Sequence, residues 1–343
     1  MSFSLNAAIV VGLGRMGCRH VQALQKIGCP RILGFDPYLK SKTDAVPEGV
    51  EIMDALTSVD GAAPELAVIA STGPSHLENL RALLEAQPIR FVLCEKPLAG
   101  SVEDGESMRQ LCAEKNVRMA VNFIRRYTPA YQDLAGFGRA GELMGPFVSM
   151  AVTCGAGGMA CNGIHYIDLG RYLFASEAVS VTAFYRDLKL PVTRGSQFED
   201  PGLYAVVNFA DGQRMFLDFS DDFGLAQHVE VCAEQGRVLI DEETCEIDVR
   251  FRSPDKRPRT LRHYGEPLEE FPFSGRHPMQ LIEPAMTALR NLSEANESIL
   301  ATTDDGIAAL EIYTAMRVSA DNGGTLVRLP LTKAQRANRY SIT

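Results

Sequence analysis

Short apolar segments alternate with amphipathic segments through the first 120 residues of this 343-residue chain. Residues 7–11 are apolar throughout, as in strands that are buried on both faces of a parallel sheet. Residues 15–27 have apolar side chains at helical spacing, and Gly28 follows. Further strands are expected over residues 31–35, 66–70, 89–94 and 117–121. Strand and helix in turn require a parallel sheet with helices on its faces, so residues 1–122 are predicted to form a doubly wound α/β domain.

Two helices of this first domain carry N-terminal cap signals. Ser75 and Glu78 have the spacing of a capping box, in which two side chains satisfy the first free N–H groups of a helix. Ser101 stands at the start of a second helix, expected over residues 101–115.

The pattern changes after residue 122. A helix is expected over residues 164–174, and short strand candidates separated by turn signals then follow, which favours an antiparallel sheet. These strands cover residues 179–186, 203–209, 214–218, 228–233, 237–240 and 244–252. Two late helices, over 279–294 and 304–320, precede a last strand over 325–329. Residues 123–343 are therefore predicted to form an α+β domain for substrate binding and oligomerisation, whose late helices pack back on the first domain.

Composition excludes several classes of protein. The formal net charge of −9 argues against a nucleic-acid partner, because such proteins present a clustered basic surface. No apolar stretch approaches the 18 or so residues of a membrane span. The eight cysteines form no CxxC pair, which indicates free thiols in a reducing cytoplasm and no metal site.

A glycine turn, Gly12-Leu13-Gly14-Arg15-Met16-Gly17, lies between the first strand and the first helix. In a dinucleotide site the first glycine permits the tight turn, the second lets the backbone approach the pyrophosphate, and the third lets the helix pack on the strand. The free N–H groups of the helix N-terminus also attract phosphate. We expect this turn to bind a dinucleotide; the alternative is a glycine turn without a ligand.

Asp36 stands at the end of the second strand, 22 residues after Gly14. A carboxylate there is expected to accept hydrogen bonds from the adenosine ribose and to repel a 2′-phosphate. The cofactor is therefore predicted to be NAD, with NADP less favoured. Lys40 and Lys42 lie close enough in the sequence to moderate that preference.

Four segments in a consistent order resemble the glucose–fructose oxidoreductase, inositol dehydrogenase and rhizopine-catabolism family (Gfo/Idh/MocA) over nearly the whole chain. The most specific is Cys94-Glu95-Lys96-Pro97-Leu98-Ala99, at the end of the strand after the loop 71–76, and the others cover residues 122–129, 163–168 and 304–311. The resemblance implies a Rossmann domain followed by a large, mainly antiparallel, open-faced sheet. That sheet would join subunits into a homodimer or homotetramer.

The resemblance also implies residue roles. Lys96 would contact both the reacting oxygen and the nicotinamide ribose, and His165 would be the general acid/base. Glu95 would contact the nicotinamide half, while Ser71, Thr72 and His76 would line the cofactor. For His76 a structural role is an equal alternative.

The chemistry of hydride transfer agrees with these roles. Oxidation of an alcohol releases a proton, which a histidine can accept near neutral pH, and a lysine can stabilise the developing alkoxide. The sequence therefore predicts an NAD-dependent oxidoreductase acting on a secondary hydroxyl or keto group of a sugar, polyol, sugar acid or nucleotide sugar. One alternative is a relative that retains NAD and catalyses hydrolysis or epimerisation through transient oxidation. Another is a non-catalytic NAD-binding regulatory protein, against which the presence of both Lys96 and His165 argues.

Further substrate contacts are expected from Arg126, Cys161, Asn162 and Asp168. Many dehydrogenases of the family carry an aspartate four residues before the histidine, where this chain has Cys161. A neutral thiol cannot act as a carboxylate does, so the thiol is either functional or a small packing residue, and Asn162 could orient a substrate hydroxyl. Arg126 could instead solvate a helix start. Asp168 could instead form a structural contact with His165, which shares its helical face.

A basic stretch from Arg250 to Arg262 stands out in this acidic chain. Such a run is usually a solvated surface, but capture of an anionic substrate or of a neighbouring subunit is the alternative.

Overall fold

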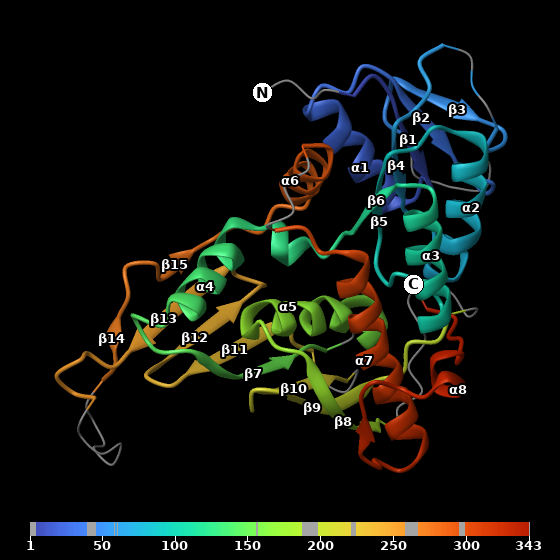
Figure 1. The fold of residues 1–343 in the computed structure, drawn as a ribbon. Coiled ribbons are helices and arrows are strands. Elements are labelled where there is room, and N and C mark those ends of the chain that lie inside the picture. The colour runs from blue at the N-terminus through green and yellow to red at the C-terminus, as the bar shows by residue number, and fades with distance from the viewer. Residues whose placement is uncertain are drawn as a thin grey trace.

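The computed structural model describes residues 5–39, 46–57, 59, 61–155, 157–186, 198–220, 224–257, 267–294 and 299–342. Two β-sheets, one parallel and one mixed, dominate this part of the chain (Figure 1). Lys40 and Lys42 of the predicted cofactor preference lie outside the described residues.

The parallel sheet has six strands in the order β3-β2-β1-β4-β5-β6. They are β1 (Ala8–Val11), β2 (Ile32–Phe35), β3 (Val50–Met53), β4 (Leu66–Ile69), β5 (Phe91–Cys94) and β6 (Arg118–Val121). Every residue of β1, β4 and β5 is buried, because helices cover both faces of these strands. The predicted doubly wound sheet is confirmed. Its strand order reverses between β1 and β4, the switch point at which doubly wound sheets bind nucleotides.

Helices cover the parallel sheet on both faces. On one face α1 (Arg15–Lys26) packs against α6 (Ile282–Ser293), and on the other α2 (His76–Ala86) packs against α3 (Val102–Glu114) (Figure 1). Helix α7 (Thr303–Asp321) contacts α3 and β6 of this sheet and also β8 of the second sheet. Helices from the last quarter of the chain therefore complete the core around the first sheet.

The second sheet has ten strands, nine of them in the order β14-β13-β12-β11-β7-β10-β9-β8-β16, with β15 paired to β13. All pairs are antiparallel except β7 with β10, so the predicted mainly antiparallel sheet is confirmed. The strands are β7 (Phe147–Thr153), β8 (Ala178–Tyr185), β9 (Leu203–Phe209), β10 (Arg214–Phe219), β11 (His228–Ala233), β12 (Gly236–Asp241), β13 (Glu246–Phe251), β14 (Glu269–Glu270), β15 (Gly275–Arg276) and β16 (Val327–Arg328).

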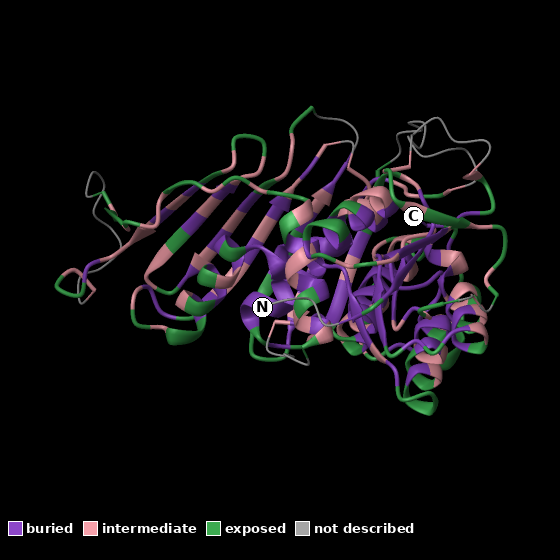
Figure 2. Ribbon diagram, turned by 90° about the horizontal axis from the view of Figure 1, so that it is seen from above, coloured by how far each residue is buried: buried purple, intermediate pink, exposed green. Residues whose placement is uncertain are grey.

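Helices lie along one face of the second sheet, and its strands alternate buried and more exposed residues (Figures 1 and 2). Helix α5 (Ile164–Phe174), predicted with the same bounds, packs on β7 and on α4 (Pro129–Ala140). The short helix α8 (Lys333–Arg336) follows β16 and contacts α7. The turns η2 (Gly73–Ser75), η3 (Ile124–Tyr127) and η4 (Met159–Gly163) precede α2, α4 and α5.

The structure corrects the cap predicted at Ser75. Its hydroxyl donates to the carbonyl oxygen of Thr72 at 2.8 Å and to the hydroxyl of Ser71 at 3.1 Å, and it caps no N–H group of α2. Because Ser75 ends the turn η2, its side chain bonds to the loop before that turn and not to the helix after it. The cap at Ser101 is confirmed, since its hydroxyl accepts from the N–H of Asp104 at 3.1 Å.

Among the described residues, no helix combines the length and the apolar character that crossing a membrane requires.

Candidate active site

The glycine turn leaves no room for side chains at two of its glycines. Gly12 has a φ of +91°, and a Cβ there would lie 2.6 Å from the backbone nitrogen of Ser71. A Cβ on Gly17 would lie 1.8 Å from the carbonyl oxygen of Gly12. Gly14 precedes α1 and no side chain caps that helix, so its first N–H groups remain available to an anion. The turn therefore fits a dinucleotide pyrophosphate; Arg15 is exposed beside it and Met16 is half-buried.

Asp36 is tied to the glycine turn by a hydrogen bond. Its Oδ2 accepts from the backbone N–H of Leu13 at 2.7 Å, and its Oδ1 accepts from the N–H of Tyr38 at 2.9 Å. The side chain is 9% exposed. The carboxylate thus shapes the turn as well as standing at the predicted ribose position after β2.

The loop after β4 lies directly against the glycine turn, through Ala70 and Ser71. The hydroxyl of Ser71 accepts from the side-chain amide of Asn79 at 2.9 Å. His76 has no exposed surface, and its ring nitrogens lie 3.1 Å and 3.0 Å from the carbonyl oxygens of Ser71 and Leu98. Burial lowers the pKa of His76. This position favours the structural role for His76, which ties two loops together.

Glu95 is buried beneath this edge of the sheet and holds three elements together. Its Oε1 lies 2.7 Å from Nε2 of His20 on α1 and accepts from the amide of Asn122, after β6, at 2.8 Å. Burial opposes ionisation, but the hydrogen bond and charge of His20, the charge of Lys96 and the amide of Asn122 together lower the pKa of Glu95 to about 2. Its predicted contact with nicotinamide stays a prediction.

Lys96 links the end of β5 to the turn η4. It follows β5 by two residues, and its Nζ donates to the carbonyl oxygen of Cys161, in η4, at 2.7 Å. The turn η4 runs directly into α5. The sequence predicted Lys96 and Cys161 as site residues, and the structure brings them together although 65 positions separate them.

His165 lies in the first turn of α5, about one helical turn after Cys161, and is 6% exposed. Its ring packs edge-on against Phe123, with ring centroids 5.9 Å apart. Asn162, between them in η4, donates through its side-chain amide to the carbonyl oxygen of Gly157 and approaches the Cys161 sulfur at 3.7 Å.

Asp200 is a residue of this region that the sequence did not single out. Its carboxylate accepts from the backbone N–H groups of Ala160 and Cys161 at 2.8 Å and 2.9 Å. A carboxylate is therefore present beside Cys161, although it comes from a segment just before β9. The sequence offers no periodicity or motif that could have paired residues this far apart.

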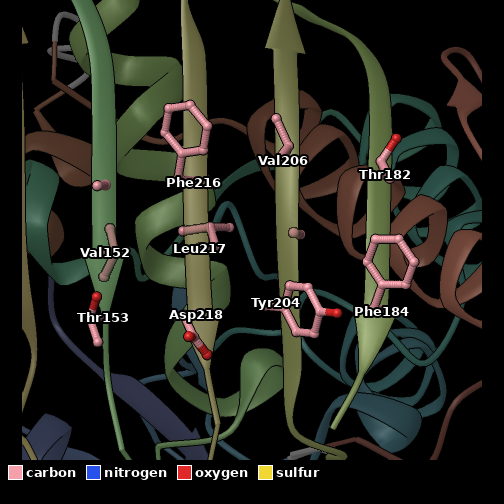
Figure 3. A pocket seen from close by; sticks show the side chains of 11 residues that line it. Val152, Thr153, Thr182, Phe184, Tyr204, Val206, Phe216, Leu217 and Asp218 are labelled. Atoms are coloured by element: carbon pink, nitrogen blue, oxygen red, sulfur yellow. The ribbon is translucent and has the colours of Figure 1, made fainter. Parts of the chain in front are cut away.

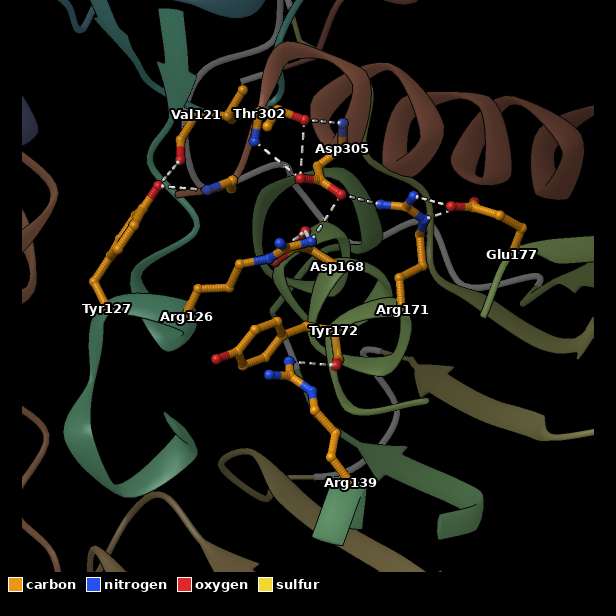
Figure 4. Close-up of polar contacts among 11 residues, drawn as sticks. Val121, Arg126, Tyr127, Arg139, Asp168, Arg171, Tyr172, Glu177, Thr302 and Asp305 are labelled. Carbon is orange, nitrogen blue, oxygen red and sulfur yellow. Dashed lines mark hydrogen bonds and ion pairs between the residues drawn. The ribbon is translucent and has the colours of Figure 1, made fainter. Parts of the chain in front are cut away.

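Arg126 and Asp168 form a buried ion pair with each other, and their predicted roles in substrate binding stay predictions. Asp168 is fully buried and accepts three hydrogen bonds from the Arg126 guanidinium, at 2.7, 2.8 and 3.1 Å. Asp305 on α7 lies 3.0 Å from Arg126 and 2.8 Å from Arg171, which also pairs with Glu177 (Figure 4). These charges satisfy one another, so the cluster joins η3, α5 and α7.

The neighbouring Arg125 is buried in a second cluster. Its guanidinium donates to both oxygens of Glu242 and lies 3.9 Å from the centre of the Tyr166 ring. Tyr131 and Tyr166 donate to the same carboxylate. Neither arginine of this pair therefore solvates a helix start.

The described part of the basic stretch is paired locally. Arg250 lies within 3.1 Å of carboxylate oxygens of Asp248 and Glu270, and Lys256 lies 3.5 Å from Glu269. Arg257 donates to the carbonyl oxygen of Leu143 at 2.6 Å. Arg259 and Arg262 lie outside the described residues. These pairings support a structural sheet edge over anion capture.

All eight cysteines carry free thiols. Across the described ranges, no cluster of three histidine, cysteine, aspartate or glutamate side chains has the arrangement that would hold a metal ion.

Comparisons with known proteins agree with this geometry. The family model GFO_IDH_MocA, described as an oxidoreductase family with an NAD-binding Rossmann fold, matches residues 6–123. Inositol 2-dehydrogenase 3 of Saccharopolyspora erythraea is 30% identical over 247 residues, which cover 67% of this chain and 72% of that protein. Inositol 2-dehydrogenase of Mycolicibacterium smegmatis is 28% identical over 248 residues, 67% of this chain and 70% of that protein.

Solved structures share the fold. A levoglucosan dehydrogenase in complex with NADH has a TM-score of 0.75 at 20% identity, covering 96% of this chain and all of that one. The glycine turn, the switch-point geometry and these matches lead to one conclusion. The chain belongs to the GFO_IDH_MocA family of oxidoreductases with an NAD-binding Rossmann fold.

Proposed function

We propose that this protein transfers a hydride between NAD and a secondary hydroxyl or keto group of a polyol or sugar. The contact between Lys96 Nζ and the Cys161 carbonyl carries the proposal, because it places the ammonium group where β5 ends and α5 begins. That edge of the sheet is where doubly wound folds bind their ligands. The names of the relatives, inositol 2-dehydrogenases, support a polyol as the substrate class.

Two side chains supply the proton chemistry in this proposal. Bound NAD would supply the acceptor for the hydride that leaves the carbinol carbon. The hydroxyl proton passes to His165, and the Lys96 ammonium stabilises the negative charge that develops on the oxygen. In the reverse direction His165 returns the proton to that oxygen. Asn162 and Cys161, both in η4, would border the substrate.

The cofactor contacts in this proposal follow the edge of the parallel sheet. The glycine turn from Gly12 to Gly17 would let the pyrophosphate approach the backbone, and the free N–H groups at the start of α1, after Gly14, would bind it. Asp36 would accept from the ribose hydroxyls, and Ser71 and Thr72 would line the cofactor. Glu95 would hold α1 in place through its contact with His20, and the backbone of Lys96 through the hydrogen bond that it accepts from the Lys96 N–H.

The experiment is an assay of NAD reduction with a panel of inositols, sugars, sugar acids and nucleotide sugars. We expect Lys96→Ala to lower kcat by roughly 100-fold or more, as for loss of a group that stabilises an oxyanion, with little change in the dissociation constant of NAD. Lys26→Ala, at an exposed position of α1, is the matched control. Wild-type turnover by Lys96→Ala would overturn the assigned role. Product without accumulating NADH would favour hydrolysis or epimerisation through transient oxidation.

We also propose that the open face of the second sheet joins subunits into a homodimer or homotetramer. Figure 3 shows the side chains of this face, which border a hollow of about 250 Å³. Phe184, Tyr204 and Phe216 are 37–42% exposed there, and the rings of Phe184 and Tyr204 stack at 5.2 Å. A row of exposed aromatic side chains on a flat sheet is typical of a protein interface.

Light scattering coupled to size-exclusion chromatography tests this interface. Phe216→Asp should yield monomers, because it places a charge in the centre of the apolar face. Tyr38→Asp, at a residue 73% exposed beside the glycine turn, should leave the mass unchanged. An oligomer of unchanged mass in Phe216→Asp would contradict the proposal.

The free thiols suit a reducing compartment, and we propose a cytoplasmic location.

A further inference from the structure

The carboxylate of Asp200 binds two backbone N–H groups of η4. Both oxygens accept from consecutive backbone N–H groups at the start of η4, those of Ala160 and Cys161. Gly158 makes this approach possible, since a Cβ there would lie 2.0 Å from Oδ2 of Asp200. The carboxylate is therefore seated in a space that only a glycine leaves open.

The same residue, Cys161, is held from its other side by Lys96. Asp200 accepts from the N–H of Cys161 at 2.9 Å, while Lys96 donates to its carbonyl oxygen at 2.7 Å. A fixed N–H restricts the backbone around Cys161, and so restricts where its carbonyl presents an acceptor. The negative charge of Asp200 also attracts the ammonium across this short stretch of backbone.

The position of Asp200 is itself fixed by the end of the chain. The N–H of Glu199 donates to the carbonyl oxygen of Ser341 at 2.8 Å, and the N–H of Tyr340 donates to that of Gly100 at 2.9 Å. Gly100 closes the loop that carries Lys96. The segment around Asp200 is thus tied to the same loop whose lysine it faces across η4.

We propose that Asp200 is a positioning residue for Lys96: by holding the Cys161 backbone, it fixes the acceptor that aims the lysine ammonium at the reacting oxygen. The catalytic consequence of this inference rests on the proposed function. The control of Lys96 by Asp200 is independent of the proposed function. A carboxylate that only capped η4 would affect stability and leave the behaviour of Lys96 unchanged.

The first test measures Lys96 directly and needs no substrate. Wild type, Asp200→Asn, Asp200→Ser and Glu199→Gln are treated briefly with dilute acetic anhydride, and acetylation of Lys96 is measured by mass spectrometry relative to exposed Lys26. Complete loss of a hydrogen bond to a charged group changes an equilibrium constant by roughly tenfold or more. We therefore expect the extent of Lys96 acetylation to rise at least about threefold in both Asp200 variants.

Glu199→Gln is the matched control, because Glu199 is adjacent to Asp200, its side chain is 69% exposed, and its carboxylate lies 3.7 Å from the Arg317 guanidinium. It should label as wild type. Asp200→Ser keeps a short acceptor, so the labelling test still decides if Asp200→Asn does not fold. Unchanged Lys96 labelling in a folded Asp200 variant overturns the proposal.

The second test is kinetic. With a polyol that the wild type oxidises, Asp200→Asn should lower kcat about tenfold or more while KM for NAD stays within about twofold, since the glycine turn is untouched. Labelling that rises without a fall in kcat also contradicts the proposal. If no polyol is oxidised by the wild type, the proposed function fails, and the labelling result still decides whether Asp200 controls Lys96.

Discussion

The buried pair of Arg126 and Asp168 gives the sharpest test of what these residues do. Asp168 has no exposed surface, and Asp168→Asn removes its charge while keeping its size. Breaking a buried ion pair by neutralising one partner costs about 3–5 kcal/mol, because the remaining charge is left in a poorly solvated place. Asp305 still lies 3.0 Å from the guanidinium, so we expect a loss near the lower end, about 3 kcal/mol.

Arg109 and Asp304 provide the matched control. Their charged atoms lie 2.8 Å apart, against 2.7 Å for the buried pair, but their side chains are 53% and 70% exposed. Water already solvates both groups, and Asp304→Asn should cost less than about 1 kcal/mol, including the weak attraction of the α7 N-terminus. The comparison therefore isolates burial at nearly constant geometry.

Urea unfolding followed by far-ultraviolet circular dichroism measures both variants, since the chain has no tryptophan for fluorescence. Equal losses for Asp168→Asn and Asp304→Asn would refute the argument from burial. A raised KM for the polyol with unchanged stability in Asp168→Asn would restore the substrate role that the sequence suggested.

Further outcomes follow from the site. The pKa of Glu95 is lowered from 4.5 to about 2, so the stability that its ionised carboxylate contributes is present above pH 4.5 and is lost as the pH falls toward 2. The difference in unfolding free energy between wild type and Glu95→Gln should therefore fall by about 3 kcal/mol over that pH range, as measured by urea unfolding at each pH. Gly17→Ala should lower stability by about 1–3 kcal/mol and weaken NAD binding measured by calorimetry, because its Cβ meets the Gly12 carbonyl; wild-type values would contradict that packing. Asp36→Asn keeps an oxygen for the Leu13 N–H and should raise the ratio of kcat/KM for NADP to that for NAD, whereas an unchanged ratio would exclude the ribose contact.

Much of the parallel sheet and of the helices that cover it was determined by local pattern. A buried parallel strand needs an apolar run, and a helix covering it needs apolar residues at a period of 3.6, so both can be recognised within a short window of sequence. The glycine turn, Asp36 and the cap at Ser101 belong to this class. Strand β3 was missed because it lies at the sheet edge with exposed central residues, which weakens the apolar signal.

Other elements depended on partners far along the chain. Helix α4 contains Gly136 and Gly138, which lower helix propensity, and Gly138 is required only because the Phe147 ring packs where its Cβ would be. Strand β7, from Phe147 to Thr153, was not predicted, because its apolar residues do not alternate regularly with polar ones. It pairs in parallel with β10 within an otherwise antiparallel sheet, an arrangement that no local pattern specifies.

The sequence by itself determined the chemistry available to this protein: a dinucleotide turn, a lysine after a buried strand, and a histidine on a helix. Only the tertiary structure decided which of these groups meet. It joined Lys96 to Cys161, brought Asp200 to the same residue, and withdrew Arg126 into a buried ion pair. The physical reason is that periodicity encodes which face of a segment is buried, whereas pairing of distant polar groups is set by how the segments pack.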